Sequence, residues 1–200
     1  MVFDFLKLEF EKPDPKTIFI NGNKLDTDFV KHVRFMLGDT IGFDYKGVRR
    51  NFVALHKWHN RTYFVSEFPL EQSNHSDLYN VLSDIKEYFP AGLISMMAKT
   101  TNKIGTKTYK HEDLFVPCLK NAGISLYESI AEEGDDSQYE LLYSSSRNRK
   151  KGDGWWLDDF MKSSTGIVVN SYGMASYAHK DTVCGVVVAF AIDTMSNEAE

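Results

Sequence analysis

The sequence predicts a single α+β domain, in which strand-like segments stand on both sides of one clearly helical stretch. β-branched and aromatic runs occur before residue 66 and again after residue 154. Between them, apolar residues recur at helical spacing from residue 78 to residue 89. A chain of 200 residues suits one domain, and it can bury a substantial core without a disulfide framework.

Composition supports an ordered, acidic domain. Apolar residues make up 42% of the chain, with 14 Phe, 10 Tyr and 3 Trp, which argues against a disordered protein. The formal net charge of −5 argues against a nucleic-acid-binding protein, because such domains usually carry a basic face. No apolar run approaches the roughly 20 residues that cross a bilayer, so no membrane partner is expected.

The two ends of the chain differ from its middle. Residues 1–16 are predicted to form an N-terminal arm, because their apolar residues fit neither a helical nor a strand period and Pro13 and Pro15 close the segment. Residues 17–193 form the single domain, and residues 194–200 are a polar tail. The start of the sequence lacks the features of a signal peptide. We therefore expect a chain that stays in the cytoplasm where it is made, or that leaves it by cell lysis or as part of a particle.

The first half of the domain reads as a series of strands. Residues 17–20 form a short β-like run, and Asn21-Gly22 predicts a tight turn after it. Strands are then predicted at residues 51–56 and 62–65, after a turn at residues 44–47.

One helix is predicted with the most regular pattern in the chain. Its apolar positions follow the i, i+3, i+4, i+7, i+11 spacing of one helical face: Leu78, Val81, Leu82, Ile85 and Phe89. Ser76 is the expected N-cap and Pro90 ends the run. A second short helix is predicted over residues 91–99.

The second half returns to strands after a polar stretch. Residues 114–116 predict a buried strand, and Pro117 begins a brief helix that Gly123 ends. A strand opens at residue 154, and a turn at residues 170–173 joins two more. Residues 183–192 form the most apolar run and are expected at the centre of a sheet.

Several segments occur in the order of a known family. They are residues 38–41, 51–55, 77–82, 89–90, 99–101, 113–117, 137–140, 154–157, 184–186 and 189–192. On these segments the chain resembles a widespread family of domains from phage structural proteins and gut-bacterial surface proteins. That family is similar to the C-type-lectin-like fold, which formylglycine-generating enzymes share. The resemblance implies a C-type-lectin-like domain with mixed and antiparallel sheets, two short helices and long loops.

The same resemblance implies a function. It points to a non-catalytic structural component of a bacteriophage virion, such as a capsid decoration, head fibre or tail-associated protein. Its partners would be other virion proteins or further copies of the chain. The alternative is a receptor-binding adhesin domain that recognises a host-cell glycan or protein. Asp158 and Asp159 replace an Arg-Ser pair of the family, and Val187-Val188 replace Arg-Pro, so the resemblance carries the fold and no site.

Candidate catalytic and metal-binding residues have simpler interpretations. His56 and His59 are too close for a helical zinc-binding pair, so no metal or cofactor is expected. The acidic run 132–136 could bind calcium, but a solvated loop is the better interpretation. Cys118 and Cys184 are expected as reduced thiols, although a bridge between them stays open. Cys118 could act as a nucleophile, but no base accompanies it, so the chain is not expected to be an enzyme.

A candidate binding surface follows from the polar stretch and the strand after it. Residues 128–153 form its main part, with the loops 158–164 and 177–182 beside it. Basic residues next to a tryptophan pair can contact nucleic acid, but the run is short and such a pair is usually core. The candidate binding residues are Tyr139, Arg147, Arg149, Lys150, Trp155, Asp158 and Asp159.

Overall fold

The computed structural model describes residues 17–104, 107–122, 124, 146–162 and 164–194. Its strands are β1 (Thr17–Ile20), β2 (Asn23–Asp26), β3 (Thr40–Tyr45), β4 (Val48–Trp58), β5 (Arg61–Ser66), β6 (Glu71–Ser73), β7 (Thr100–Ile104), β8 (Lys107–His111), β9 (Gly154–Lys162), β10 (Thr165–Asn170), β11 (Ala175–His179), β12 (Cys184–Val186) and β13 (Ala189–Asp193). Its helices are η1 (Thr27–His32), η2 (His75–Asp77), α1 (Leu78–Lys86), α2 (Ala91–Ile94), α3 (Leu119–Ala122) and η3 (Ser146–Arg149).

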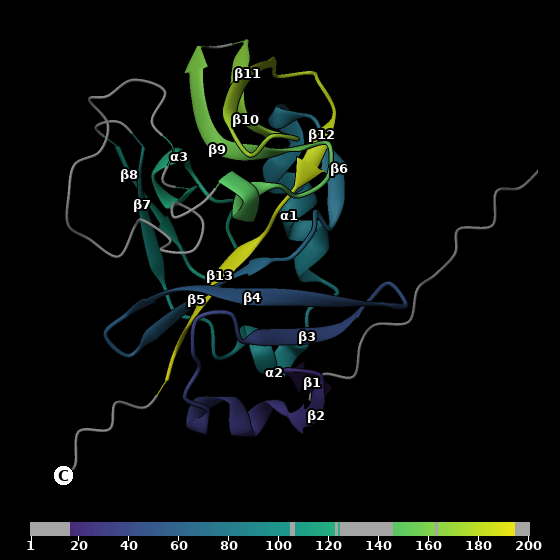
Figure 1. Cartoon of the computed structure of the whole chain (residues 1–200), viewed down its shortest axis with the longest axis vertical. Coiled ribbons are helices and arrows are strands. Elements are labelled where there is room, and N and C mark those ends of the chain that lie inside the picture. Colours follow the sequence, from purple (N-terminus) through teal and green to yellow (C-terminus); the bar gives the residue numbers. More distant parts are fainter. Residues whose placement is uncertain (1–16, 105–106, 123, 125–145, 163, 195–200) are drawn as a thin grey trace, which may run out of the picture.

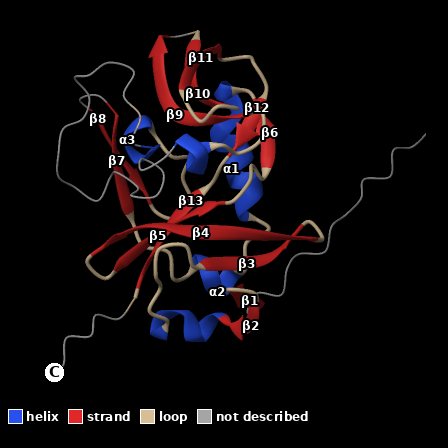
Figure 2. Cartoon of the chain, viewed as in Figure 1, coloured by secondary structure: helices blue, strands red, loops and turns tan. Residues whose placement is uncertain are grey.

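Two open sheets make up most of the described chain, as Figures 1 and 2 show. The six-stranded sheet has the order β13-β5-β4-β3-β1-β2, and the five-stranded sheet has the order β11-β10-β9-β12-β6. A separate hairpin pairs β7 with β8. Most of the pairings are antiparallel, and β12 runs parallel to β9. The predicted α+β class with mostly antiparallel sheets and few, short helices is therefore confirmed.

The early turns form where the sequence predicts them. Asn21 (φ 49°) and Gly22 (φ 83°) join β1 to β2, and both take the left-handed backbone that a tight hairpin turn needs. Lys46 and Gly47 do the same between β3 and β4, within the predicted turn 44–47. The hairpins of the six-stranded sheet therefore follow from local sequence.

The predicted helical face is confirmed. The start of the first helix and the end of the second differ from the predicted positions. Leu78, Leu82 and Ile85 are buried on one face of α1. Ser76 is not the N-cap: Asn74 caps the preceding turn η2 by accepting a hydrogen bond from the Asp77 backbone N–H at 3.0 Å.

The second helix, α2, ends at Ile94 rather than at residue 99. After it, Ala98 donates a backbone hydrogen bond to Ala191 at 2.8 Å, and Met97 forms a β-bridge with Ile192. Pairing with β13 therefore replaces the last helical turn.

The apolar run 183–192 does not form one central strand, which corrects that prediction. It divides into β12, which lies between β9 and β6, and β13, which lies at an edge of the other sheet beside β5. Between them, Val188 is held by Ser66 through both its backbone N–H and its carbonyl. The run is apolar throughout because it crosses the core from one sheet to the other (Figure 1).

The predicted strand at 114–116 is also wrong. These residues are buried, but Phe115 makes only an isolated bridge to Ala189. The three consecutive buried residues here reflect packing between elements rather than strand pairing. The helix after Pro117 is present as α3, while the expected stop at Gly123 lies outside the described residues.

At β9 the five-stranded sheet is buried on both faces, as its two neighbouring tryptophans show. Trp156 packs in one core cluster with Phe52, Phe89 and Phe190, which come from the other sheet and the helical region. Trp155 packs in a second cluster on the opposite side of β9. Both side chains are 0% exposed, so β9 is fixed in position along its first half.

Candidate functional site

The basic segment before β9, residues 147–151, is hydrogen-bonded to the turn between β10 and β11. Arg149 donates from Nε to the Gly173 carbonyl at 2.8 Å. The Trp155 indole N–H in turn donates to the Arg149 carbonyl at 2.9 Å. Trp155 is therefore a buried support for this segment and not a contact residue, which corrects its predicted binding role.

Lys151 fixes the same segment from the other side. Its side chain is buried, and its ammonium group donates to the backbone carbonyls of Ser66 at 2.7 Å and Glu67 at 3.2 Å. Burial lowers the pKa of Lys151 to about 8, and the nearby Glu67 charge partly opposes that shift. The remaining cations of the run, Arg147 and Lys150, are exposed.

The turn itself is held by a local network. Asn170 Oδ1 accepts hydrogen bonds from the backbone N–H groups of Tyr172 at 2.9 Å and Met174 at 3.2 Å. The Asn170 backbone closes the loop with two further bonds, to Met174 and from Gly173, each 2.9 Å long. An Asn side chain can accept hydrogen bonds from backbone N–H groups of a turn, in place of a backbone carbonyl. The turn is therefore preorganised.

Large apolar side chains project from this rigid turn. Tyr172 is 68% exposed and Met174 is 55% exposed, and Tyr177 on β11 is also exposed. Tyr, Met and Arg are the residue types enriched in protein interfaces. We use the name hairpin surface for Arg147, Lys150, Tyr172, Met174 and Tyr177.

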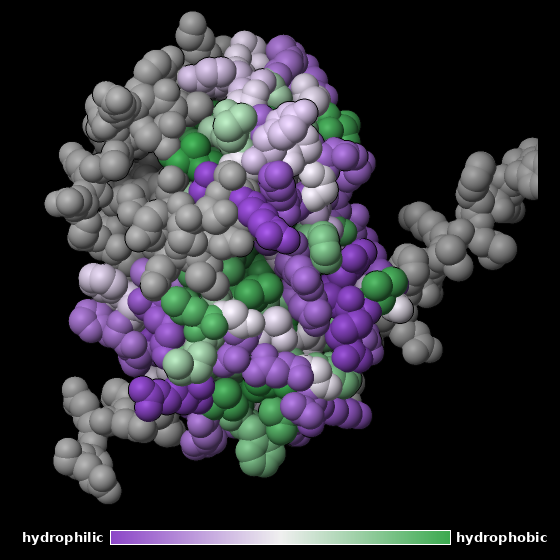
Figure 3. Space-filling model, in the orientation of Figure 1, coloured by the Kyte–Doolittle hydropathy of each residue, from purple (hydrophilic) through white to green (hydrophobic). Residues whose placement is uncertain are grey.

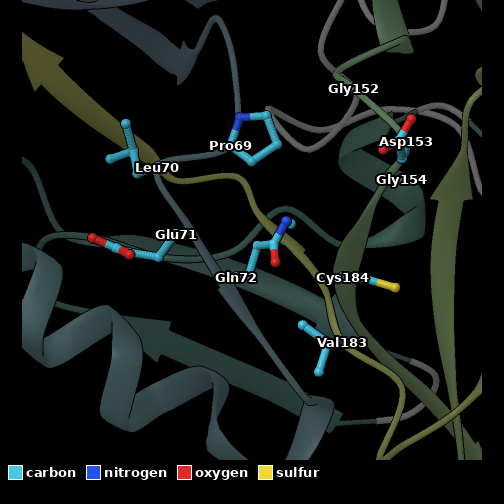
Figure 4. A pocket seen from close by; sticks show the side chains of 10 residues that line it. Pro69, Leu70, Glu71, Gln72, Gly152, Asp153, Gly154, Val183 and Cys184 are labelled. Carbon is cyan, nitrogen blue, oxygen red and sulfur yellow. The ribbon is translucent and has the colours of Figure 1, made fainter. Parts of the chain in front are cut away.

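A groove of about 660 Å³ lies next to the hairpin surface (Figure 4). It is lined by residues 69–72, 152–154 and 183–185. Three of these ten residues are glycines; Gly154 and Gly185 pack closely against Val169 and Pro69, and only Gly152 leaves open space above its backbone. None of the ten is Lys, Arg or His, so the groove itself does not attract anions. Gly154 pairs with Asn170 across the sheet, which joins the groove to the hairpin turn.

The groove carboxylate Glu71 already has partners. Its Oε1 accepts a hydrogen bond from the Tyr45 hydroxyl at 2.6 Å and pairs with the Lys46 ammonium at 2.5 Å. Burial and this contact raise the pKa of Tyr45, so the hydroxyl remains a donor. The contact ties the β3–β4 turn to the edge strand β6. Of the two lining carboxylates, the exposed Asp153 is therefore better placed to meet a ligand.

Asp158 lies apart from this surface. It is 5% exposed on β9, and its Oδ1 accepts a hydrogen bond from the Tyr79 hydroxyl at 2.6 Å, while Oδ2 is buried without a partner. Burial raises the pKa of Asp158 to about 6, and the Tyr79 bond partly opposes this. Asp158 is therefore not one of the exposed binding residues. The side chain of Asp159 and all of Tyr139 lie outside the described residues.

The structure thus brings together Arg147, Arg149 and Lys150 with a turn that the sequence indicated but did not place. Tyr172, Met174 and Lys151 were missing from the predicted set. The signal for the first two was an aromatic and a Met at a predicted turn. Nothing in the sequence signals the burial of Lys151, because lysine is rarely fully buried.

The described residues contain no group of three or more His, Cys, Asp or Glu residues placed to hold a metal. Cys118 and Cys184 are free cysteines, and Cys118 is buried. Burial raises the pKa of Cys184, which leaves less of the reactive thiolate. The acidic run 132–136 lies outside the described residues.

Comparisons with known proteins return no match among family models, curated proteins or solved structures. Within the described part of the chain, no helix combines the length and apolar character needed to cross a membrane.

Proposed function

We propose that the chain is a non-catalytic structural component of a bacteriophage virion, which binds its neighbours through the hairpin surface. The observation that supports a binding role is the preorganised turn that exposes Tyr172 and Met174 beside two exposed cations. A rigid turn lowers the entropic cost of binding, because its side chains are already positioned. The virion location is supported by the family resemblance of the sequence.

The buried ionisable residues support a non-catalytic role. Lys151 and Asp158 are the kind of shifted groups that often mark active sites. Lys151 donates to two backbone carbonyls, and Asp158 holds the Tyr79 hydroxyl. Both therefore serve to position the chain around β9.

The finer fold in this proposal is a C-type-lectin-like domain. Two open, mostly antiparallel sheets with short helices support it. In such a domain a fixed core carries surface loops whose side chains can serve binding. The domain would belong to a capsid decoration, a head fibre or a tail-associated protein, with other virion proteins or further copies as partners.

Particle association tests the proposal directly. Particles from the strain that encodes the chain are purified on a density gradient and probed with an antibody to the purified chain. We expect the protein to band with intact particles and to be labelled on them by immunogold electron microscopy. Protein that remains entirely in the soluble fraction would contradict the proposal.

A receptor-binding adhesin is the second candidate. The segment Asn170–Tyr177 combines Asn, Ser, Tyr and Gly, the composition typical of recognition loops. A glycan array and binding to host cells test this function. Binding that is lost in Tyr172→Ala, with the fold retained, would favour the adhesin, whereas particle association without such binding would favour the virion component.

A further inference from the structure

We infer that the hairpin surface and the adjoining groove receive residues 1–16 of a second copy of this chain. The inference rests on the proposed function, because it names the neighbour and the contact through which copies would assemble. It makes the assembly heterologous: a segment of one copy binds a different surface of the next. Contacts of this kind build rings or extended lattices.

The receiving surface is continuous. Gly154 lines the groove and pairs with Asn170, the residue that organises the hairpin turn. Arg149 connects η3 to the same turn through Gly173. A single extended segment that fills the groove would therefore also meet Tyr172 and Met174.

The groove suits a polypeptide backbone. A Cβ atom placed on Gly152 would have no neighbour within 4 Å, so space is open above this residue. In Figure 4, the Gln72 side chain lies between those of Glu71 and Asp153, which provides hydrogen-bonding groups along the groove. Val183, which is 62% exposed, supplies apolar area at its side.

Residues 1–16 have the composition that this surface requires. After Met1, six of the next nine residues are large and apolar: Val2, Phe3, Phe5, Leu6, Leu8 and Phe10. Glu9 and Glu11 complement the exposed cations Arg147 and Lys150, and Lys7 complements Asp153. Lys7, Glu9 and Glu11 are two positions apart, so an extended chain would present all three to one surface.

The length of the segment allows it to reach a neighbour. Pro13 and Pro15 favour an extended backbone just before β1 begins at Thr17. Sixteen extended residues span at most roughly 50 Å, since each contributes about 3.3 Å. This reach exceeds the radius of a domain of this size, which is roughly 16 Å as a radius of gyration.

The setting of its exposed apolar side chains distinguishes this site from others. On the part of the face coloured in Figure 3, apolar side chains form several separate patches among polar ones. The hairpin surface differs because its exposed Tyr172 and Met174 come from one hydrogen-bonded turn beside a groove. Phe29 and Met36 are exposed to a similar degree, 59% and 60%, but they line no part of this groove.

Photo-crosslinking in the full chain tests the inference. Phe5 is replaced by benzoylphenylalanine, the purified chain is mixed with an equal amount of ¹⁵N-labelled chain, and the mixture is irradiated. We expect mixed-isotope crosslinks from position 5 to residues 152–154, 172–174 or 183. Crosslinks confined to single chains, crosslinks between copies at other surfaces, or an absence of covalent dimers would each overturn the inference.

A matched pair of double variants provides the control. We expect Tyr172→Ser with Met174→Ser to reduce the crosslink at least about fivefold, the size of effect typical of a central interface residue. Phe29→Ser with Met36→Ser removes similarly exposed side chains and should leave it unchanged. Crosslinks between copies at another surface would overturn this docking site but not the virion role, whereas loss of particle association would contradict the virion role itself.

Discussion

The segment before β9, residues 147–151, carries cations on two sides. Those on the inward side make hydrogen bonds within the fold, whereas those on the outward side are exposed. On the inward side, Arg149 and Lys151 donate to backbone carbonyls of Gly173, Ser66 and Glu67. On the outward side, Arg147 and Lys150 are exposed. Within five residues, charge alone does not distinguish a cation that holds the fold together from one that is exposed.

The contrast between the two sides shows how a small domain can hold an exposed segment in place through the inward side chains of the same segment. The inward contacts hold the segment to both the hairpin turn and the loop that follows β5. The backbone that carries the outward side chains is then held in place, which reduces the conformational entropy that this backbone would lose on binding. Substitutions on the two sides should therefore affect different properties, stability on one and association on the other.

The largest effect is expected for Trp155→Ala. The substitution removes a side chain that is 0% exposed and its hydrogen bond to the Arg149 carbonyl. We expect a loss of about 3–5 kcal/mol in the free energy of unfolding, typical of a buried Trp truncation. Urea denaturation followed by circular dichroism measures it. A variant of unchanged stability that fails to bind would instead make Trp155 a contact residue.

Lys151→Met should have the next largest effect. It keeps an unbranched side chain of similar length but leaves the carbonyls of Ser66 and Glu67 without this donor. We expect a loss of about 1–3 kcal/mol in unfolding free energy, the cost of unsatisfied buried acceptors. Lys150→Met is the matched control, and its unfolding free energy should change by less than about 0.5 kcal/mol. Equal losses of unfolding free energy in Lys151→Met and Lys150→Met would contradict the distinction between a buried structural lysine and an exposed one.

Asp158→Asn should increase stability at neutral pH. The folded-state pKa of Asp158 is raised from 3.8 to about 6, so the folded chain binds the proton more tightly than the unfolded chain. Stability from this group is therefore present below pH 4 and is lost as the pH rises through about 6. Asn can still accept the Tyr79 hydrogen bond, so we expect a gain of up to about 3 kcal/mol at pH 7.5.

The gain in Asp158→Asn should shrink toward zero at pH 4, where the wild-type carboxyl is protonated in the folded state. Thermal unfolding of both proteins across pH 4 to 8 measures the difference. A pH-independent difference would show that Asp158 does not titrate as its burial implies.

The smallest effect on stability is expected for Arg147→Ser with Lys150→Ser. Both side chains are exposed, so we expect the free energy of unfolding to change by less than about 0.5 kcal/mol. Association between copies should weaken and lose part of its salt dependence, because the substitutions remove two cations from the surface that we propose receives Glu9 and Glu11. Sedimentation velocity at low and high salt measures this, and unchanged association would leave the cations without a role.

The local features of the fold could be predicted from the sequence. The turns at Asn21-Gly22 and within residues 44–47 depend on residues that favour left-handed backbone, and the face of α1 depends on helical spacing. The division of residues 183–192 could not be predicted. A run that is apolar throughout fits one central strand or a crossing between two sheets equally well, and only long-range contacts such as Ser66 with Val188 decide between them.

The candidate site shows the same limit. The sequence indicated the basic run and the turn at residues 170–173 separately, but nothing in their spacing places them together. The bond from Arg149 to Gly173 joins residues 24 positions apart, and Lys151 reaches carbonyls 84 and 85 positions away. The orientation of each cation depends on these tertiary contacts, so burial of Lys151 and Asp158 was not foreseeable from residue type.

Size-exclusion chromatography with light scattering is the most direct measurement of the central claim, that the hairpin surface joins copies of the chain. The full chain is compared with Tyr172→Ser/Met174→Ser and with the control Phe29→Ser/Met36→Ser across a range of concentrations. We predict that the full chain and the control self-associate, while the hairpin variant is a folded monomer. A full chain that stays monomeric throughout, or a hairpin variant that associates as the full chain does, would contradict the account.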